Sequence, residues 1–437
     1  MKIKNVHIFG GGTVAHIANH FAVCAPAYGT TAKYLKEIMQ NDPRFDNFHI
    51  RLELTKMAGG NLETNEDVAK RIDELKAESR TKIIFFNCAL VDFIPAYLNS
   101  YKETRPSVGS GEDSLLNTEA NLTLERFGKY DGRLETNQTD ILEIGFVPSS
   151  KIIPNIRNGR KDIFLVGFKT TCGATKQEMY EKGLRLCKTG SVNLVLVNDT
   201  KTHWNMIVTP EEAAYHETDN RETVLKNLVE MAWYRSHLTF TQSTVVDGKP
   251  VSWDDERIPN NIRTVVNHCI NSRAYKVFNG STVGHFAVKL SDTEFLTSIR
   301  KSNFNDLDKN GMVYVKTDGP DTVIAYGAKP SVGGQSQRIV FRNHEGMDCI
   351  VHFHSPFKPN HPDDIPVVSQ REVECGSHQC GKNTSDNLKQ FGNLKAVMLN
   401  NHGPNIVFSK NTDSQEVINF IERNFDLSQK TGGYNLR

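Results

Sequence analysis

The stretch Val6-His-Ile-Phe-Gly-Gly-Gly-Thr13 lies near the start of the chain and joins a short apolar run to three glycines. Short apolar runs of this kind are typical of buried β-strands. Amphipathic stretches with apolar residues at helical spacing occupy residues 65–76 and 176–188. Strand, helix and strand in repetition predict an α/β fold with a parallel sheet covered by helices. The further strand-like runs of this half are residues 49–54, 83–86, 163–166 and 194–197.

The composition is that of an ordinary globular protein, with 437 residues of which 38% are hydrophobic and 24% charged. Fifty-two Lys and Arg balance fifty-one Asp and Glu, so we expect neither a nucleic-acid nor a membrane partner. No apolar run approaches the roughly 18 residues of a membrane span, and Met1-Lys-Ile-Lys lacks a signal-peptide pattern. The eight cysteines contain no CxxC motif, so we expect a reduced, cytoplasmic protein. The stretch Cys375-Gly-Ser-His-Gln-Cys380 fits no closed zinc pattern.

The chain changes character after a predicted helix near residues 221–235. A turn-rich stretch follows, and the remaining residues mix helices with short strand-like runs, which favours an α/β domain with a largely antiparallel sheet. We therefore expect a first domain over residues 1–235, a linker over 236–261 and a second domain over 262–437. The polar segment 99–137 is predicted to be a long excursion or flap.

The three glycines after the first apolar run are candidates for an anion site. Glycine lets backbone N–H groups approach a phosphate closely, and the N-terminus of a following helix would add its dipole. Gly10, Gly12 and Ala15 also fit a loose GxGxxA pattern, with Glu53 as the acid within range. Three interpretations stay open: a nucleotide phosphate site, a nicotinamide dinucleotide site, and a tight strand-to-helix turn without a ligand.

Further polar residues stand at the expected carboxyl ends of strands, where open α/β sheets bind ligands. A single Asp or Asn at a strand end is usually a cap or turn residue, whereas four such places on one sheet favour a site. The four stretches are Leu90-Val-Asp92-Phe-Ile-Pro, Phe146-Val-Pro-Ser-Ser-Lys151, Leu165-Val-Gly-Phe168-Lys-Thr-Thr and Leu196-Val-Asn198-Asp199.

In this order, these pieces and the Gly-Gly-Gly-Thr stretch resemble the phosphopantothenoylcysteine ligase family over residues 5 to about 215. The resemblance implies a doubly wound, usually dimeric domain that binds a nucleotide triphosphate, ATP or CTP. The chain departs from that family at Phe21–Thr31, which lacks the Asn of the cysteine-coupling step. The resemblance places beside the phosphates Gly11, Gly12 and Thr13, and around the rest of the nucleotide Asp92, Lys151, Phe168, Asn198 and Asp199.

Ile350-Val-His352-Phe-His354-Ser-Pro is the sharpest local signal in the second half. Residues two apart on a strand face the same way, so His352 and His354 can present both imidazoles to Zn²⁺ or a related divalent ion. His402 follows an apolar strand-like run, and Gly403 allows a turn that brings it into the same space. The alternative is a pair of half-buried histidines bonded to backbone groups.

With His402 included, residues from about 262 to 425 resemble the class II aldolase and adducin family. In that family three histidines hold the catalytic divalent metal, commonly zinc. The resemblance also assigns Gly284, Thr297 and Ser331 to a pocket for a substrate phosphate. The matching segments are Ser281-Thr-Val-Gly284-His-Phe-Ala, Phe295-Leu-Thr297-Ser, Ala328-Lys-Pro-Ser331, His352-Phe-His354-Ser-Pro and Asn401-His402-Gly403.

One family feature is missing: the acid that normally follows Pro-Ser-Ser is replaced by Val332-Gly333-Gly334. Loss of a positioned acid slows proton transfer by about 10²–10⁴-fold. Glu372 and Glu374 are candidate catalytic substitutes, because both follow the metal segment on an expected strand. Tyr434 is another, because the family often borrows a tyrosine from a neighbouring subunit. The alternatives are exposed acids and a frayed terminal tyrosine.

The combined prediction is a cytoplasmic two-domain enzyme that forms a homo-oligomer. Its second domain would be a metal-dependent lyase or epimerase for a small phosphorylated sugar or carbonyl compound, and its first domain would bind a nucleotide. Two alternatives stay open. One is a nucleotide-dependent acid–amine ligase of the phosphopantothenate–cysteine type. The other is a non-catalytic, adducin-like scaffold, which the two departures from the family patterns favour.

Overall fold

The computed structural model describes residues 4–101, 128–130, 132–134, 141–331 and 334–436. The chain folds into two compact units. Unit 1 contains Met1–Phe168 and Thr189–Ser191, and unit 2 contains Lys169–Lys188 and Val192–Arg437. The predicted flap, residues 99–137, falls mostly outside the described residues. Among the described helices, none has the length and apolar character needed to cross a membrane.

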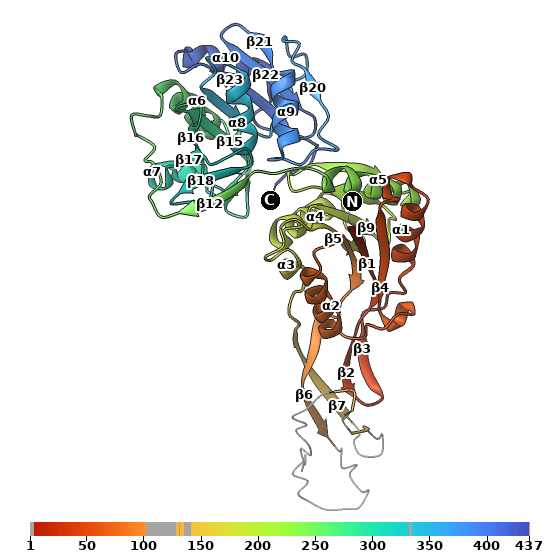
Figure 1. The fold of residues 1–437 in the computed structure, drawn as a ribbon. Helices are drawn as coiled ribbons and strands as arrows, with labels where there is room; N and C mark the ends of the chain where they lie inside the picture. Colours follow the sequence, from red (N-terminus) through yellow and green to blue (C-terminus); the bar gives the residue numbers. More distant parts are fainter. Residues whose placement is uncertain (1–3, 102–127, 131, 135–140, 332–333, 437) are drawn as a thin grey trace, which may run out of the picture. The chain divides into compact units, whose positions relative to one another are not determined.

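Unit 1 is built on parallel strands in the order β4-β1-β5-β8 (Figure 1). The chain passes from β1 to β4 on one side and returns to β5 on the other, which is the reversal of a doubly wound sheet. Ile8 lies in register with Leu52 and Phe85 and is fully buried. The predicted parallel sheet is therefore confirmed. The strands are β1 (Lys4–Gly12), β4 (Phe48–Leu54), β5 (Thr81–Ala89) and β8 (Phe164–Thr171).

Helix α2 (Asn65–Ala77) forms over the predicted amphipathic stretch 65–76, and α1 (Thr30–Gln40) is a further amphipathic helix. Helix α1 packs on β1 and β4 and buries Ala32, Leu35 and Met39, which recur at helical spacing. Helix α2 begins with a capping box, in which Thr64 Oγ1 accepts from Asp67 N and Asp67 Oδ2 accepts from Thr64 N. Shorter helical turns are α3 (Ile153–Ile156), η1 (Pro43–Phe45) and η2 (Lys56–Ala58).

The glycine stretch does not form the expected turn into a helix. Gly10 to Gly12 are the last residues of β1, and an antiparallel hairpin, β2 (Val14–Ala18) and β3 (Phe21–Cys24), precedes α1. Close packing explains the glycines: a Cβ atom at Gly10 would lie 2.4 Å from Ala32 Cβ, and one at Gly12 would lie 1.7 Å from Ala25 O. A second ribbon pairs β6 (Phe93–Tyr101) with β7 (Ile141–Pro148).

The first part of unit 2 contains three strands and two long helices. Strand β10 pairs antiparallel with β9 and β11, so that Met206 lies opposite Val197 and Ile207 opposite Tyr215. Asn220 caps the second helix, because its side chain accepts from Thr223 N. These elements are α4 (Lys176–Gly190), β9 (Leu194–Asp199), β10 (Asn205–Val208), β11 (Ala214–Thr218) and α5 (Arg221–Ser236).

The second part of unit 2 is a ten-stranded sheet with the order β12-β18-β17-β16-β15-β19-β23-β22-β20, and β21 pairs with β22 (Figure 1). Its pairs are antiparallel except β12 with β18 and β20 with β22, so the predicted largely antiparallel sheet is confirmed. Residues 242–246, expected in the linker, form the edge strand β12. The strands are β12 (Gln242–Val246), β15 (His285–Lys289), β16 (Glu294–Ser298), β17 (Met312–Thr317), β18 (Thr322–Tyr326), β19 (Cys349–His352), β20 (Val367–Val368), β21 (Lys389–Phe391), β22 (Leu394–Leu399) and β23 (Gly403–Phe408).

Helices cover both faces of this sheet, since alternate residues of each central strand enter different cores. Phe286 and Val288 pack in one core with α6 and α10, while Ala287 packs in the other with α8. Helix α9 contacts α8. The helices are α6 (Asn260–Asn271), η3 (Phe304–Asp306), α7 (Leu307–Asn310), α8 (Gly334–Asn343), α9 (His378–Asn387) and α10 (Ser414–Asn424), and a small hairpin joins β13 (Val277–Phe278) to β14 (Ser281–Thr282).

Candidate metal centre

Three histidines predicted from the sequence converge at the ends of neighbouring strands. His352 is the last residue of β19, His354 follows two residues later, and His402 stands between β22 and β23. Strand β19 pairs with β23, which brings these segments together. One ligand atom from each histidine lies within 4.8 Å of the others, and all three residues are buried.

Backbone geometry fixes the position of His402. Asn401 and Gly403 both have positive φ, 58° and 151°, and His402 N donates to Leu399 O at 3.0 Å. A Cβ atom at Gly403 would lie 2.0 Å from Phe353 O, so only glycine fits there. The turn therefore places His402 close to the segment that carries His354, and the two ring centroids are 4.6 Å apart.

The ring nitrogens of His352 and His402 are arranged as metal ligands require. His352 Nδ1 lies 2.8 Å from Pro404 O; a carbonyl only accepts, so Nδ1 carries the proton and Nε2 has the free lone pair. That Nε2 lies 3.3 Å from His402 Nε2. Ligand nitrogens around a tetrahedral Zn²⁺ with bonds of about 2.0–2.1 Å are about 3.3 Å apart. The pair therefore fits a divalent ion.

The environment keeps all three imidazoles neutral. Burial lowers the pKa of His352 and of His402 well below the usual value, and neighbouring histidines lower both further. Burial also lowers the pKa of His354, although Glu212 opposes this. A neutral imidazole is the form that binds metals. In addition, His402 Nδ1 is buried without a hydrogen-bond partner among the described residues.

Glu212 is the acid beside this centre, and it comes from the turn between β10 and β11. Its Oε2 lies 3.0 Å from His354 Nδ1, at ion-pair distance although outside hydrogen-bond geometry, and both side chains are buried. Burial opposes ionisation, but Lys188 and His354 hold the pKa of Glu212 well below its usual range. Lys188 Nζ pairs with Glu212 Oε1. Glu212 is therefore a buried, ionised carboxylate.

A fourth histidine supports the centre from β15. His285 lies opposite His352 in the sheet, and the two ring centroids are 4.8 Å apart. Gln337 Nε2 contacts His285 Nδ1, and Thr297 Oγ1 donates to Gln337 Oε1 at 2.9 Å. Burial lowers the pKa of His285 to about 3. The side chains of Thr297, Gln337 and His285 are thus linked in series, and the His285 ring contacts the ring of His352.

The predicted phosphate residues lie around this support. Gly284 has φ of 113°, and a Cβ atom there would lie 2.5 Å from His352 O. Thr297 is fully buried with its hydroxyl engaged by Gln337, so it supports the site from inside the fold. Ser331 is half-buried, and its N–H donates to Ser298 O at 2.9 Å. Val332 and Gly333, where the family acid is missing, lie outside the described residues.

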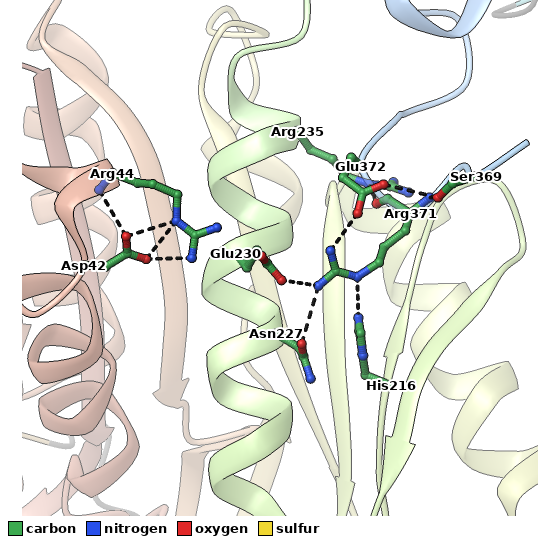
Figure 2. A network of polar contacts seen from close by, with 9 residues as sticks. All are labelled: Asp42, Arg44, His216, Asn227, Glu230, Arg235, Ser369, Arg371 and Glu372. Carbon is green, nitrogen blue, oxygen red and sulfur yellow. Dashed lines mark hydrogen bonds and ion pairs between the residues drawn. The ribbon is translucent and has the colours of Figure 1, made fainter. Parts of the chain in front are cut away.

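Glu372 and Glu374 do not lie on the expected strand, because this stretch bends around its own side-chain contacts. Glu372 pairs with Arg371 at 2.7 Å and accepts from Ser369 Oγ at 3.2 Å. Figure 2 shows Arg371 reaching from this loop to Glu230 on α5. Glu374 accepts from Asn193 Nδ2 at 3.0 Å. The contacts of Glu372 stay within its loop, whereas Glu374 ties the loop to Asn193 beside β9.

Tyr434 folds back onto the residues around Glu212. Its ring stacks on Tyr180 with centroids 4.8 Å apart, and its hydroxyl donates to Glu217. Tyr180 OH in turn donates to Glu212 O at 2.8 Å. The C-terminal segment also supplies Thr431, which donates to the backbone oxygens of His354 and His402. The C-terminal segment of the same chain therefore contacts two of the three histidines directly, through Thr431.

The predicted nucleotide residues of unit 1 gather at the carboxyl ends of β1 and β5. Thr13 Oγ1 donates to Asn65 Oδ1 at 2.7 Å and accepts from Val91 N at 2.9 Å, so it ties α2 to the segment after β5. Asp92 and Lys151 form an exposed ion pair of 2.6 Å beside the β6–β7 ribbon. Phe168 is half-buried on β8. Gly11 and Gly12 end β1, as described above.

The other two predicted nucleotide residues, Asn198 and Asp199, end β9 in unit 2. The carboxylate of Asp199 accepts from the backbone N–H groups of Gly173, Ala174, Lys201 and Thr202. Burial works against ionisation, yet these hydrogen bonds hold the pKa of Asp199 below its usual range. Asn198 accepts weakly from Thr170. Asp199 therefore organises two loops, which is the structural alternative for an acid at a strand end.

Comparison with known proteins places a family resemblance on the half that carries the centre. Residues 266–422 match the model described as Class II Aldolase and Adducin N-terminal domain, and this segment contains all three histidines. The N-terminal segment with Glu212 lies outside the match. No curated protein matches the chain significantly.

Solved structures resemble the two halves separately. A DNA/pantothenate metabolism flavoprotein from Streptococcus pneumoniae is 14% identical with a TM-score of 0.37, covering 52% of this chain and 97% of that one. YgbL from Escherichia coli, a putative aldolase/epimerase/decarboxylase, is 22% identical with a TM-score of 0.28, covering 37% and 83%. L-fuculose 1-phosphate aldolase is 15% identical with a TM-score of 0.28, covering 37% and 80%. The resemblance to the class II aldolase and adducin family, stated from the sequence, recurs in the family-model match.

Proposed function

We propose that this protein is a divalent-metal-dependent lyase or epimerase that acts on a small phosphorylated sugar or related carbonyl compound. His352, His354 and His402 would hold the metal, with zinc as the expected ion. The observation that carries the proposal is the convergence of three buried imidazoles within 4.8 Å, inside the segment that matches the aldolase and adducin family. Neutral ligands and a dry setting suit a Lewis-acid site.

A divalent ion bound there supplies Lewis-acid chemistry, which polarises a carbonyl oxygen of the substrate. The chain's own residues do the rest. Gln337 and Thr297 hold His285 beside His352, and Glu212 is a buried carboxylate 3.0 Å from His354 Nδ1. Glu372, Glu374 and Tyr434 remain the proposed residues for proton transfer. Of these, Tyr434 stacks on Tyr180, whose hydroxyl donates to the backbone oxygen of Glu212.

The substrate class follows from the loops that the resemblance assigns to a phosphate. We assign phosphate binding to the backbone at Gly284 and to the hydroxyl of Ser331, with Thr297 as a buried support. Gly284 has a positive φ, and a Cβ atom there would lie 2.5 Å from His352 O, so the Gly284 backbone runs close beside a metal ligand. A phosphorylated carbonyl compound would then present its carbonyl to the metal and its phosphate to this loop.

Unit 1 would bind a nucleotide triphosphate, ATP or CTP. Gly11, Gly12, Thr13, Asp92, Lys151 and Phe168 stand at or near the carboxyl ends of its parallel strands, where such sheets bind ligands. Of the pair in unit 2, Asn198 stays in the proposal, while the contacts of Asp199 favour its structural role. Domains at 1–235 and 262–437, a homo-oligomer and a cytoplasmic location complete the proposal.

The test of this function is turnover. Purified protein reconstituted with Zn²⁺ or Mn²⁺ is screened for cleavage or epimerisation of sugar phosphates and related carbonyl compounds. We expect activity that a chelator removes and the metal restores, and that His402→Ala lacks. Turnover that needs a nucleotide triphosphate and is indifferent to the chelator would instead support the acid–amine ligase. Absence of both activities would support the scaffold.

A further inference from the structure

One group at the metal centre comes from outside the segment that matches the family model. We propose that Glu212 is a positioning residue for this centre: its carboxylate faces Nδ1 of His354 at ion-pair distance and so leaves His354 Nε2 for the metal. This inference rests on the proposed metal site. It assigns to residues upstream of the matched segment 266–422 a direct part in metal affinity.

The geometry of the pair supports this role. Glu212 Oε2 lies 3.0 Å from His354 Nδ1, and the two side chains are only 3% and 5% exposed. A carboxylate that engages Nδ1 leaves Nε2 for a metal, and metal-binding histidines generally donate their second N–H to a carboxylate or a carbonyl. His352 already shows this arrangement toward Pro404 O. Glu212 holds the corresponding place beside Nδ1 of His354, at ion-pair distance.

The turn that carries Glu212 is held in place from several sides. Its backbone has a positive φ of 61°, which is costly for a glutamate. Tyr180 OH and Lys430 Nζ donate to its backbone oxygen at 2.8 and 2.7 Å, and Lys188 pairs with the second carboxylate oxygen. These contacts fix a strained, buried acid in one orientation, so its oxygen toward His354 is pre-positioned.

The centre also explains why the carboxylate is tolerated in the interior. A buried charge is costly unless other groups compensate it. Lys188 compensates one oxygen, and a histidine that binds a cation through Nε2 compensates the other, because the metal makes the Nδ1–H a stronger donor. Lys188 and Glu212 both precede the matched segment. The region around 188–212 thus belongs functionally to the metal centre.

Metal titration of the full chain tests the role of Glu212. Metal-free wild type, Glu212→Gln, Glu212→Asp and the control Glu222→Gln are titrated with Co²⁺, whose visible absorption reports ligand geometry. Glu222 is a matched control because it lies on α5 in an exposed ion pair with Lys226. We expect Glu212→Gln to bind Co²⁺ about 10–100-fold more weakly with a shifted spectrum, and Glu212→Asp to recover part of both. Wild-type affinity and spectrum in Glu212→Gln would overturn the inference.

A measurement on the wild type decides the matter if Glu212→Gln does not fold. In Zn²⁺-loaded protein labelled with ¹⁵N-histidine, the His354 resonances are assigned by their loss in His354→Ala. A protonated Nδ1 and a metal-bound Nε2 support the proposal, whereas metal bound through Nδ1 overturns it. Wild type that binds neither Co²⁺ nor Zn²⁺ overturns the proposed function as well. Metal binding that is indifferent to Glu212 overturns this inference alone.

Discussion

Arg235 Nη1 lies 2.6 Å from Glu211 Oε1, and the two side chains are 0% and 1% exposed. Arg235 also donates to the backbone oxygens of Gln370 and Arg371, at 2.9 Å each. The ion pair joins α5 to the turn that carries Glu211 and Glu212. The two hydrogen bonds of Arg235 join the same helix to the loop that follows β20. Figure 2 shows Arg235 on α5, the helix that also carries Asn227 and Glu230, the two α5 partners of Arg371. Burial raises the pKa of Glu211 to about 7, so removal of Arg235 would leave a buried acid that takes up a proton, and removal of Glu211 would leave a buried guanidinium without its counter-charge.

Arg235→Met should lower the free energy of unfolding by roughly 3–5 kcal/mol, because it leaves the buried Glu211 side chain without its ion-pair partner. Lys226→Met is the matched control, since Lys226 makes an ion pair on the same helix in which both side chains are 59% exposed. The control should cost less than about 1 kcal/mol. Urea unfolding followed by circular dichroism measures both. Equal effects in the two variants would show that the buried pair carries no special weight.

Glu53 makes unit 1 sensitive to acid. Burial favours its protonated form, but hydrogen bonds from His7 and Arg71 lower the pKa of Glu53 from its usual 4.5 to about 2. A folded-state pKa below the unfolded value means that the stabilisation is complete above pH 4.5 and is lost as the pH falls toward 2. The full effect is about 3 kcal/mol.

The free energy of unfolding of wild type and Glu53→Gln, measured from pH 6 to pH 3, tests this dependence. The difference between them should shrink as the pH falls, because only the wild type loses a charged partner for Arg71. Glu66→Gln, at an exposed position in the first turn of α2, should show no such convergence. A gap between wild type and Glu53→Gln that stays constant with pH would contradict the role of the Glu53 ion pairs.

Gly403→Ala should abolish metal binding or unfold the ten-stranded sheet of unit 2. Its φ of 151° is unfavourable for a side chain, and the added Cβ would meet Phe353 O at 2.0 Å. Gly346→Ala provides the comparison, because Gly346 also has a positive φ but nothing lies within 4 Å of the added carbon. That variant should cost only about 1–2 kcal/mol and keep the metal. If both variants lose metal equally, backbone strain alone accounts for the effect.

Gln337→Leu tests the support behind His352. It removes the buried partner of His285 Nδ1 and one of the two acceptors of the buried Thr297 hydroxyl, which keeps its contact with Phe286 O at 3.3 Å. Stranded polar groups cost about 1–3 kcal/mol, so we expect a loss of stability in this range together with weaker metal binding. Thermal unfolding and metal titration measure the two quantities. Unchanged metal affinity would show that the Thr297–Gln337–His285 chain stabilises the fold without serving the centre.

Much of the fold could be predicted because hydrophobic periodicity survives in each strand. Ile83 to Phe86 is a continuous apolar run, and Val6 to Phe9 is interrupted only by the buried His7, as is typical of parallel strands buried on both faces. The glycine stretch was harder, because the same residues suit a phosphate turn and a crowded strand end. Only the packing of Ala25 and Ala32 against β1 distinguishes these cases, and local sequence does not report it.

The convergence of the three histidines could be predicted from the His-x-His spacing of His352 and His354 and from Gly403, which indicates a tight turn beside His402, although the strand itself ends at His352. Glu212 was not predicted, because its contact with His354 is long-range. The signal available was a pair of acids, Glu211-Glu212, flanked by apolar residues in Val208-Thr-Pro-Glu-Glu-Ala-Ala. Acids in such surroundings need buried partners, which marks them for attention.

Metal content measured by mass spectrometry tests the central claim most directly. Purified wild type is compared with the double variant His352→Ala/His354→Ala after incubation of both with Zn²⁺ or Mn²⁺ and removal of loose metal. We predict about one divalent ion per chain in the wild type and none in the double variant, with circular dichroism spectra that match. A wild type that retains no divalent ion, or a double variant that retains the same amount, would contradict the account.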